Sequence, residues 1–368
     1  MKIPKKTIAC IFDCLCGHSQ CWGHNPVLIR PAEEGVVEFV FNTADAQVFV
    51  RANAEGEIPS VLLDLPRTVD VLKPHAQYTT VQVSRDGFSV GLQVGPDKYS
   101  VRTDVVFSDS DEEPISPIVF DPWVSLSWPR EDLDNVLHAA ASFAAPPFPD
   151  ICVARDGLFA TDKIQALIYT GGLPSQALMP IHGDAARMAT GLTITSVSWN
   201  DKYCCIEGRL DREYPTRIIA PRRTICTERT FEDLLFIKKS QSYHKSFSFY
   251  AQLDQFVHLV HLLMAATGAY NDGIDLEVHQ GNVFLKSDYT DPIPLRAYRV
   301  AGDVSIRLDP VRIQNFRSLP APNRGLVEFY GTDNVSPLCI RSGPYTILLM
   351  PRHPRRKEAA DENPYQGA

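Results

Sequence analysis

Residues 151–171, ICVARDGLFATDKIQALIYTG, decide how this chain folds. Apolar and polar side chains alternate through ICVARDGLFATD and again through IQALIYTG, a pattern typical of short β-strands. Arg155-Asp156-Gly157 separates two alternating runs and predicts a tight hairpin turn. The stretch therefore predicts neighbouring strands joined by short turns.

Helical sequence precedes these strands, and a second helix-plus-strands segment follows them. In residues 129–144 apolar side chains recur at helical spacing along one face. That face comprises Leu133, Val136, Leu137 and Ala140. Residues 177–191, ALMPIHGDAARMATG, predict a strand that leads into a short helix, and residues 192–218 predict three closing strands. The middle of the chain thus reads helix, strands, short helix, strands.

The same order recurs on both sides of this middle segment. Opening helices are predicted in residues 4–15 and 251–268, and the latter has an apolar face of its own. That face comprises Phe256, Leu259, Val260 and Leu263. A proline, whose missing N–H costs little in a first helical turn, stands at or near the start of each short helix: Pro66, Pro180 and Pro310. We expect an α+β protein in which six helix-plus-strands motifs pair into three domains.

Two breaks divide the chain. SDSDEEPISP at residues 108–117 is acidic, contains prolines and lacks apolar periodicity, so it predicts a linker. A second break falls at residues 220–230, between a strand-like run and a new amphipathic pattern. We expect domains at residues 1–116, 117–228 and 229–353, followed by a disordered tail at residues 354–368.

Composition narrows the functional class. A chain with 44% hydrophobic and 22% charged residues has enough apolar side chains to build cores. No apolar run approaches the roughly 20 residues of a membrane span, so we expect a cytosolic protein. The net charge of −8 disfavours indiscriminate nucleic-acid binding, but it leaves room for a basic surface on one face. No nucleophile-elbow, P-loop or dinucleotide motif is present, so we expect neither an enzyme nor a cofactor.

Cysteines and histidines form three groups that could suggest chemistry. The N-terminal group comprises Cys10, Cys14, Cys16, Cys21, His18 and His24. It lacks the CxxC pair typical of structural zinc sites, so buried thiols are the preferred interpretation and a metal site is the alternative. Cys204 and Cys205 alternate across a strand. His258 and His261 lie one helical turn apart without an intervening HExxH pattern, which favours a surface pair.

Four segments in the second half of the chain resemble the bacterial β sliding clamps, the processivity factors of DNA polymerase III. LFATDKIQALIYTG at residues 158–171 resembles the clamp segment with a strand, a Thr-Asp turn and a second strand. ALMPIHGDAARMA, RLDREYPTRIIAP and YTILLMPRH look like its strand-to-helix passage, its exit from the second domain and its closing strand. The four segments fall in the family's order, whereas the first domain matches only in length and element order.

The resemblance implies three clamp domains per chain and a head-to-tail homodimer that forms a ring around double-stranded DNA. In the family, the ring tethers the replicative polymerase and other factors, and an ATP-hydrolysing clamp loader opens it. The clamp itself has no nucleotide site. An alternative from another class is a clamp-fold protein-binding or regulatory module that no longer encircles DNA. An enzyme of unrecognised type is a more distant alternative.

A partner-peptide groove follows from the same resemblance. Its expected lining is Thr161, Ile164, Gln165, Ala166, Pro215, Ile219, Leu348, Met350, Pro351 and Arg352. The family has Gly-His-Arg-Leu after Thr-Asp, whereas this chain has Lys163-Ile164-Gln165-Ala166, so a different partner peptide is expected. A basic group extends beyond the closing strand: Arg352, Arg355, Arg356 and Lys357. It could cover the groove or attract an acidic partner.

Cations on the expected inner helices could face a duplex. Contact with phosphates alone gives affinity without sequence preference, as a sliding protein requires. The candidates are Lys5, Lys6, Arg67, Lys73, His182, Arg187, Arg312, Arg317 and Arg324. Any solvated helix carries some cations, so ordinary surface positions are the alternative interpretation.

Overall fold

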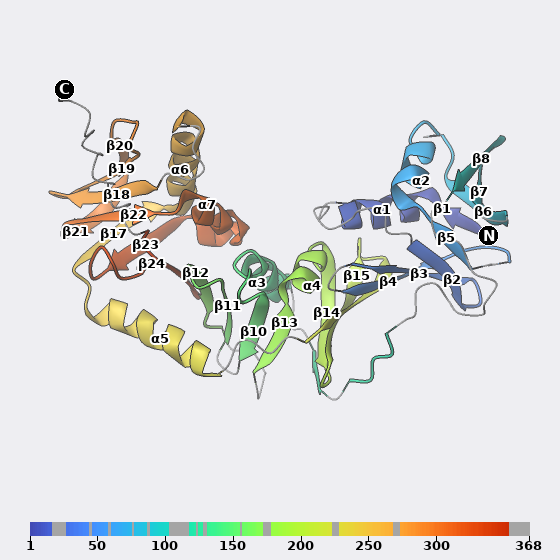
Figure 1. Ribbon diagram of the computed structural model, residues 1–368, viewed down its shortest axis with the longest axis horizontal. Helices are drawn as coiled ribbons and strands as arrows, with labels where there is room; N and C mark the ends of the chain where they lie inside the picture. Colours follow the sequence, from blue (N-terminus) through green and yellow to red (C-terminus); the bar gives the residue numbers. More distant parts are fainter. Residues whose placement is uncertain are drawn as a thin grey trace, which may run out of the picture. The chain divides into compact units, whose positions relative to one another are not determined.

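The structure is a computed structural model that divides into two compact units (Figure 1). Unit 1 comprises residues 1–145, 149–155 and 173–226, and unit 2 comprises residues 146–148, 156–172 and 227–368. The structure describes residues 1–352 except 17–26, 44–45, 58–59, 76, 87–88, 103–117, 123, 128–130, 155–156, 172–177, 223–227 and 268–272. The predicted linker and tail therefore lie outside the described residues, and the three predicted domain boundaries stay predictions.

Unit 1 is built on an eight-stranded antiparallel sheet in the order β5-β2-β3-β4-β16-β15-β14-β9. Its strands are β2 (Val27–Glu33), β3 (Val36–Asn42), β4 (Gln47–Asn53), β5 (Val61–Leu63), β9 (Val124–Ser127), β14 (Leu192–Trp199), β15 (Tyr203–Leu210) and β16 (Tyr214–Pro221). Four further strands form the sheet β1-β6-β7-β8. They are β1 (Lys2–Pro4), β6 (Thr80–Asp86), β7 (Ser89–Val94) and β8 (Asp97–Arg102). The antiparallel pair β10 (Asp150–Ala154) and β13 (Met179–His182) completes the unit.

Unit 1 also contains two pairs of packed helices. α1 (Lys5–Cys16) contacts α2 (Leu65–Leu72), and α3 (Glu131–Ala141) contacts α4 (Gly183–Met188). Asp64 caps α2 by accepting a hydrogen bond from the Arg67 amide, which satisfies one of the free N–H groups at that helix end.

Unit 2 has a second antiparallel sheet, in which the strands follow the order β11-β12-β25-β24-β23-β17-β21. They are β11 (Gly157–Thr161), β12 (Gln165–Tyr169), β17 (Phe247–Gln252), β21 (Ala297–Ala301), β23 (Leu326–Gly331), β24 (Leu338–Ser342) and β25 (Tyr345–Leu349). A smaller sheet has the order β20-β19-β18-β22. It comprises β18 (Ile274–His279), β19 (Asn282–Lys286), β20 (Ile293–Leu295) and β22 (Val304–Leu308). The helices are α5 (Glu228–Tyr243), α6 (Leu253–Thr267), α7 (Pro310–Ile313), η2 (Gln314–Ser318) and η3 (Ala321–Arg324).

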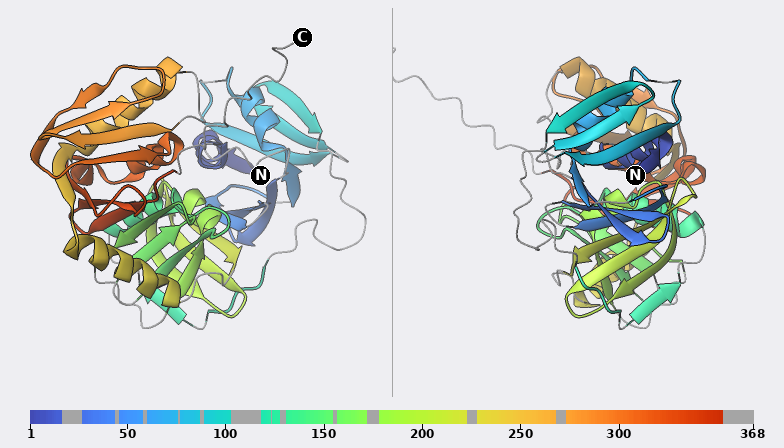
Figure 2. Two further views of the ribbon diagram at one scale, coloured as in Figure 1. Left: turned by 60° about the vertical axis from the view of Figure 1, so that its left-hand side comes forward. Right: turned by 90° about the vertical axis from the view of Figure 1, so that its right-hand side faces the viewer.

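The helices α5 and α6 cover opposite faces of the larger unit 2 sheet (Figure 2). Phe249 and Phe329 are cross-strand partners and pack against Phe256 of α6. Successive residues of a strand alternate between the two faces, so every second side chain points away from α6. Phe159 of β11 lies on this other face, and Phe231 of α5 stacks on it with 5.0 Å between ring centroids. A helix on each face explains why this sheet is buried on both sides.

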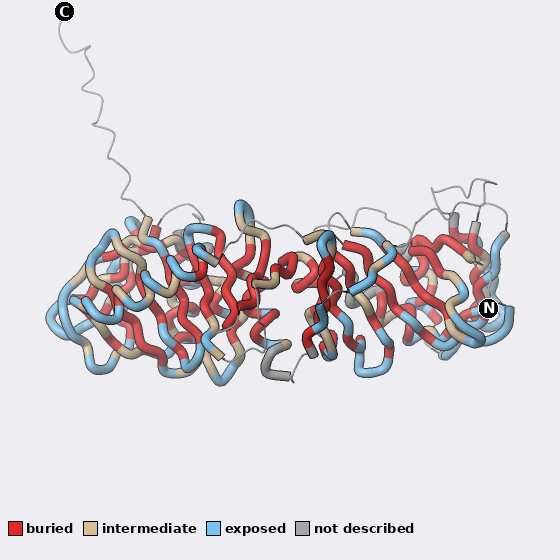
Figure 3. The backbone as a smooth tube through the Cα atoms, turned by 90° about the horizontal axis from the view of Figure 1, so that it is seen from below, coloured by how far each residue is buried: buried red, intermediate tan, exposed pale blue. Residues whose placement is uncertain are grey.

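Buried residues run through the strands of both units (Figure 3), and most of them are apolar. In unit 1 one cluster joins Leu28, Val40, Phe49, Cys205 and Ile219 across the eight-stranded sheet. The strands predicted in residues 151–171 also lie in the cores, since β10, β11 and β12 are buried along almost their whole length.

Most predicted elements are present. The three opening helices are observed as α1, α3 and α6, and the predicted face of α6 is buried except for the half-buried Leu259. Gln280 and Gly281 form a turn between β18 and β19 with positive φ angles, as a tight hairpin requires. Pro66 and Pro310 occupy the first turn of their short helices.

Three features differ from the prediction. A strand precedes each opening helix (β1, β9 and β17). β1 and β9 have only three and four residues, too few for a clear alternating pattern, whereas FSFYAQ of β17 does alternate and was overlooked. Pro180 lies inside β13, where its carbonyl accepts a hydrogen bond from Trp199, rather than in the first turn of α4. The whole of α5 was missed, because its half-buried and exposed positions do not separate into clean faces.

Candidate functional site

The turn between β11 and β12 holds the centre of the predicted groove. Thr161 donates its hydroxyl to the Gln165 carbonyl at 2.7 Å and accepts the Lys163 amide at 3.1 Å. The Asp162 carboxylate accepts the amides of Ile164 and Gln165 at 2.9 and 2.8 Å. Since every residue of the turn takes part, its backbone is held in one conformation. Lys163 has a φ of 75°, a left-handed conformation that side chains with a Cβ rarely adopt.

Asp162 connects this turn to α7. Its side chain is fully buried, and the Arg312 guanidinium lies 2.5 Å from its second carboxylate oxygen. A buried carboxylate requires a charged or hydrogen-bonding partner. The ion pair therefore anchors the turn to the short helix that Pro310 begins.

Ile164 and Met350 form an exposed apolar pair beside the turn. The Met350 amide donates to the Ile164 carbonyl at 2.8 Å, which extends the β12–β25 ladder by one step. Side chains of directly opposed residues lie on the same face of an antiparallel pair. Each of the two side chains is 39% exposed. They therefore offer adjoining apolar surface to a partner.

The rest of the predicted floor is buried. Ala166 and Leu348 follow Ile164 and Met350 on the same sheet face, and both are less than 5% exposed. Thr161 and Gln165 are also buried. In this part of the expected groove, only the outermost row, Ile164 and Met350, is thus exposed.

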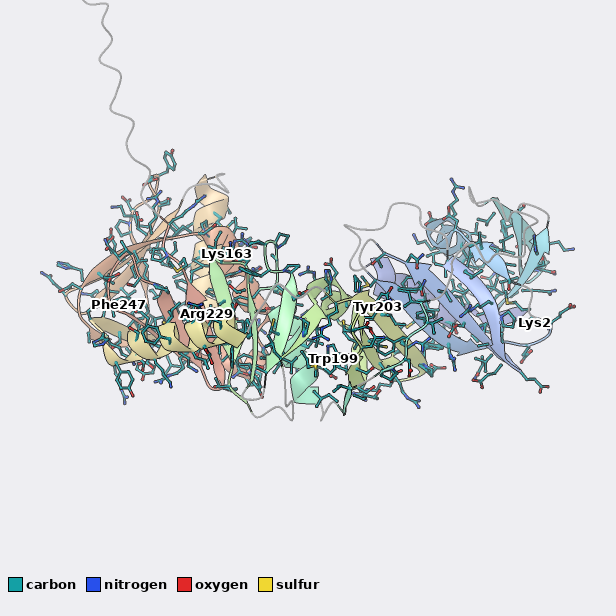
Figure 4. All side chains as sticks on the ribbon, turned by 60° about the horizontal axis from the view of Figure 1, so that its bottom comes forward. Lys2, Lys163, Trp199, Tyr203, Arg229 and Phe247 are labelled. Carbon is teal, nitrogen blue, oxygen red and sulfur yellow. The ribbon has the colours of Figure 1, made fainter. Side chains whose placement is uncertain are left out.

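Helix α5 accounts for this burial. Phe231 near its first turn stacks on Phe159 of β11, and Gln241 near its end accepts hydrogen bonds from Thr332, the residue after β23. Figure 4 shows α5 along the sheet, with Arg229 labelled near its start. Between these contacts the helix crosses β12 and β25, which lie between β11 and β23. By strand register Ala166 and Leu348 are on the same sheet face as Phe159, the face on which α5 lies. Ten residues of helix span about 15 Å, which suits the crossing of several strands about 4.8 Å apart.

Pro215 and Ile219 belong to the other unit. Both lie on β16 in unit 1, whereas the other predicted groove residues belong to unit 2. Ile219 is fully buried in the core cluster of the eight-stranded sheet, so its assignment to a groove is corrected. Pro215 is exposed and lines a hollow of about 390 Å³ together with Phe49 and Arg217.

Most of the cations predicted to face DNA form ion pairs within their own unit. Lys6 lies 2.9 Å from Asp211, and the hydrogen bond between them raises the pKa of Lys6. Further pairs are Arg67 with Asp64, Lys73 with Asp70, Arg187 with Asp184, and Arg324 with Asp254. Exposed pairs of this kind are weak, so the cations can exchange a carboxylate for a phosphate. Lys5 donates to the His75 carbonyl, and Arg317 is exposed on η2.

Besides Arg312, two more predicted DNA-facing residues have structural roles. His182 is buried and accepts the Asp184 amide at the start of α4, so its assignment to a DNA-facing surface is corrected. A buried imidazole that caps a helix cannot reach a phosphate. Arg187 donates to the carbonyls of Ala141 and Ala144 and thereby ties α4 to α3.

The cysteine and histidine groups show no metal-binding arrangement in the described part of the chain. Cys10 is half-buried on α1, while His18, Cys21 and His24 lie outside the described residues. Cys204 and Cys205 are both buried, and burial raises the pKa of the Cys204 thiol to about 11. His258 and His261 are exposed on α6.

Comparisons with known proteins connect this geometry to one fold. No protein-family model matches the sequence, and no curated protein matches it. Solved structures do. A putative DNA polymerase III beta subunit from Eubacterium rectale superposes with a TM-score of 0.72 at 11% identity, over 96% of this chain and 100% of that one. The beta subunit from Thermotoga maritima gives 0.71 at 11% identity, over 96% and 99%.

The chain has the sliding-clamp fold. A third match is the Helicobacter pylori beta clamp bound to a DNA ligase peptide, with a TM-score of 0.70 at 11% identity over 95% of this chain and 98% of that one. The resemblance drawn from short motifs in the second half of the sequence thus extends over nearly the whole chain, including the first domain. Low identity explains why sequence comparison alone finds no relative.

Two features of the surface were not indicated by the sequence. The Thr-Asp turn was predicted, but not the positive φ of Lys163, because glycine, asparagine and aspartate are the usual residues in that conformation. Nothing in the sequence indicated that α5 would cover the floor. Among the described residues, no helix is both long and apolar enough to cross a membrane.

Proposed function

We propose that the protein is a DNA sliding clamp. Two chains would close into a homodimeric ring around double-stranded DNA, and the ring would tether a replicative polymerase and other factors. A clamp loader would open and close it. The chain itself would perform no chemistry and would need no cofactor.

The likeness to sliding clamps over 96% of the chain carries this proposal. Helix pairs support it: α1 packs with α2, α3 with α4 and α6 with α7, one pair for each of the three domains of the fold. Lys6, Arg67 and Lys73 are exposed on or beside the first pair. Cations at such intervals suit contact with phosphates without sequence preference.

Topology of DNA binding tests the proposal. The protein, loaded onto nicked circular DNA with a clamp loader, should stay bound during gel filtration and should be released when a restriction enzyme linearises the circle. Light scattering should give about twice the chain mass of 41.0 kDa. Equal loss from circular and linear DNA, together with a stable monomer, would contradict the proposal.

One observation favours the alternative of a clamp-fold module that no longer encircles DNA. Most of the candidate DNA-facing cations are paired with carboxylates of their own unit, and His182 is buried. This reduces the positive charge available to a duplex. A monomer that retains peptide binding but shows no topological retention on DNA would support this alternative.

We further propose that partner peptides dock at Ile164 and Met350. The exposed pair lies beside the rigid Thr161–Gln165 turn, so the apolar surface is presented without a cost of ordering. Ile164→Ser with Met350→Ser should abolish binding of a polymerase-derived peptide while leaving the thermal midpoint within a few degrees, because both side chains are already partly exposed.

A further inference from the structure

We infer that the partner peptide of this surface carries carboxylates beside its apolar anchor, and this inference rests on the proposed docking at Ile164 and Met350. The surface offers little apolar area, because α5 covers the rows of side chains behind that pair. A single exposed row can accommodate one anchor residue of a peptide. Additional affinity and selectivity therefore require polar contacts around the row.

A cation adjoins each residue of the exposed pair in the sequence. Lys163 immediately precedes Ile164 and is exposed, with its ammonium 5.3 Å from the centre of the Phe148 ring. Arg352 follows Met350 by two residues, and its amide is fixed to the Arg307 carbonyl at 2.7 Å. The apolar row is thus bordered by a cation on each of its two strands.

The carboxylate of the turn does not offset the charge of Lys163. Asp162 is buried and neutralised by Arg312 at 2.5 Å, and its oxygens already accept two backbone amides. Its negative charge is therefore paired in the interior, with α7, while Lys163 is exposed. The turn separates the two charges and leaves the partner-facing side positive.

A peptide that fits this surface would place a Leu, Met or Phe side chain against Ile164 and Met350. Asp or Glu residues on either side of that anchor would face Lys163 and Arg352. Rim charges act mainly on the association rate and on the choice among partners. The expected selectivity is thus for acidic over neutral or basic versions of one apolar peptide.

Fluorescence anisotropy with three labelled peptides tests this inference on the full chain. The peptides share a Leu-Phe anchor and differ only in their flanks, which are Asp/Glu, Asn/Gln or Lys. The acidic peptide should bind about threefold to tenfold more tightly than the neutral one, and the difference should shrink as salt rises. The basic peptide should bind weakest.

Charge reversal makes the test specific. Lys163→Glu and Arg352→Glu should each weaken the acidic peptide and strengthen the basic one, whereas Lys239→Glu, at an exposed cation on α5, should change neither. Lys163→Gly removes the charge while easing the backbone, so a loss of acidic selectivity in that variant cannot be ascribed to misfolding.

Two outcomes would overturn the inference, and only one of them would also reject the proposed docking surface. Equal binding of the acidic and neutral peptides at low salt would reject the charge selectivity but leave the docking surface intact. Failure of all three peptides to bind the folded wild-type chain would reject the docking surface itself. Retention on circular DNA is measured separately, so neither peptide result decides whether the protein is a sliding clamp.

Discussion

At the scale of single residues, backbone conformation and buried charge determine the candidate surface. Lys163 has a φ of 75° in a turn whose backbone is held by hydrogen bonds from the side chains of Thr161 and Asp162. Strain of this kind persists only where the surroundings enforce it. The exposed cation is therefore held in place by buried polar groups beneath it.

Lys163→Gly should leave the free energy of unfolding unchanged or raise it by up to about 1 kcal/mol. Glycine adopts positive φ without a clash, and this gain is partly offset because glycine makes the unfolded chain more flexible. Lys163→Val should destabilise, since a β-branched side chain fits this conformation poorly. Denaturant unfolding measures both. A glycine variant less stable than the valine variant would contradict the backbone explanation.

Arg312→Ala should destabilise the chain by about 3 kcal/mol, because it leaves the buried Asp162 carboxylate without its counter-charge. Thermal or urea unfolding measures the loss. Lys73→Ala removes an exposed pair with Asp70 and serves as the control, which should leave the midpoint unchanged within error. Arg312→Ala combined with Asp162→Asn should recover part of the loss, and no recovery would contradict the pairing.

At the scale of elements, α5 changes what the sheet can offer. The residues beneath it, among them Ala166 and Leu348, would form an apolar floor if the sheet face were open. Phe231 secures the start of the helix on Phe159, and Gln241 secures its end. The partner surface is therefore defined by a helix as much as by the strands.

Phe231→Ala should destabilise by about 3 kcal/mol, because it removes a buried ring stacked on another ring. Phe236→Ala on the same helix should have almost no effect, since that side chain is 72% exposed. Urea unfolding compares the two. Hydrogen exchange should also show faster exchange in α5 of the Phe231 variant, and an unchanged rate would contradict the anchoring role.

At the scale of the whole molecule, one arrangement is repeated, in which a pair of packed helices lies on antiparallel sheets. Residues far apart in the sequence build each unit: β4 pairs with β16, and β12 pairs with β25. Such pairings follow from tertiary assembly and cannot be inferred from local patterns. The sliding-clamp likeness is a property of this arrangement rather than of shared residues.

Replacing Lys6, Arg67 and Lys73 together by Glu should reduce loading onto circular DNA several-fold, because duplex binding depends on cations near phosphates. A matched charge reversal at Lys239, Lys202 and Arg229, which are exposed elsewhere, should have a smaller effect. The number of clamps retained per DNA circle measures both. Equal losses would show that net charge, rather than these positions, governs loading.

Local sequence was sufficient to predict α1, α3, α6 and most strands, since periods of 3.6 and 2 are written directly in the order of apolar side chains. Motifs such as LFATDKIQALIYTG were sufficient to predict the clamp fold, because their order along the chain is retained where identity is not. The same motifs predicted the Thr-Asp turn, which is observed, whereas their placing of Ile164 and Met350 in a partner groove stays a prediction.

Only the tertiary structure decided which of the predicted site residues are accessible. Ile219 and His182 carry the expected residue types but lie in cores, and Ala166 and Leu348 lie under α5. Accessibility depends on what packs against a face, and that is set by elements distant in sequence. Local periodicity records which face of an element is apolar, but it contains no information about what covers that face.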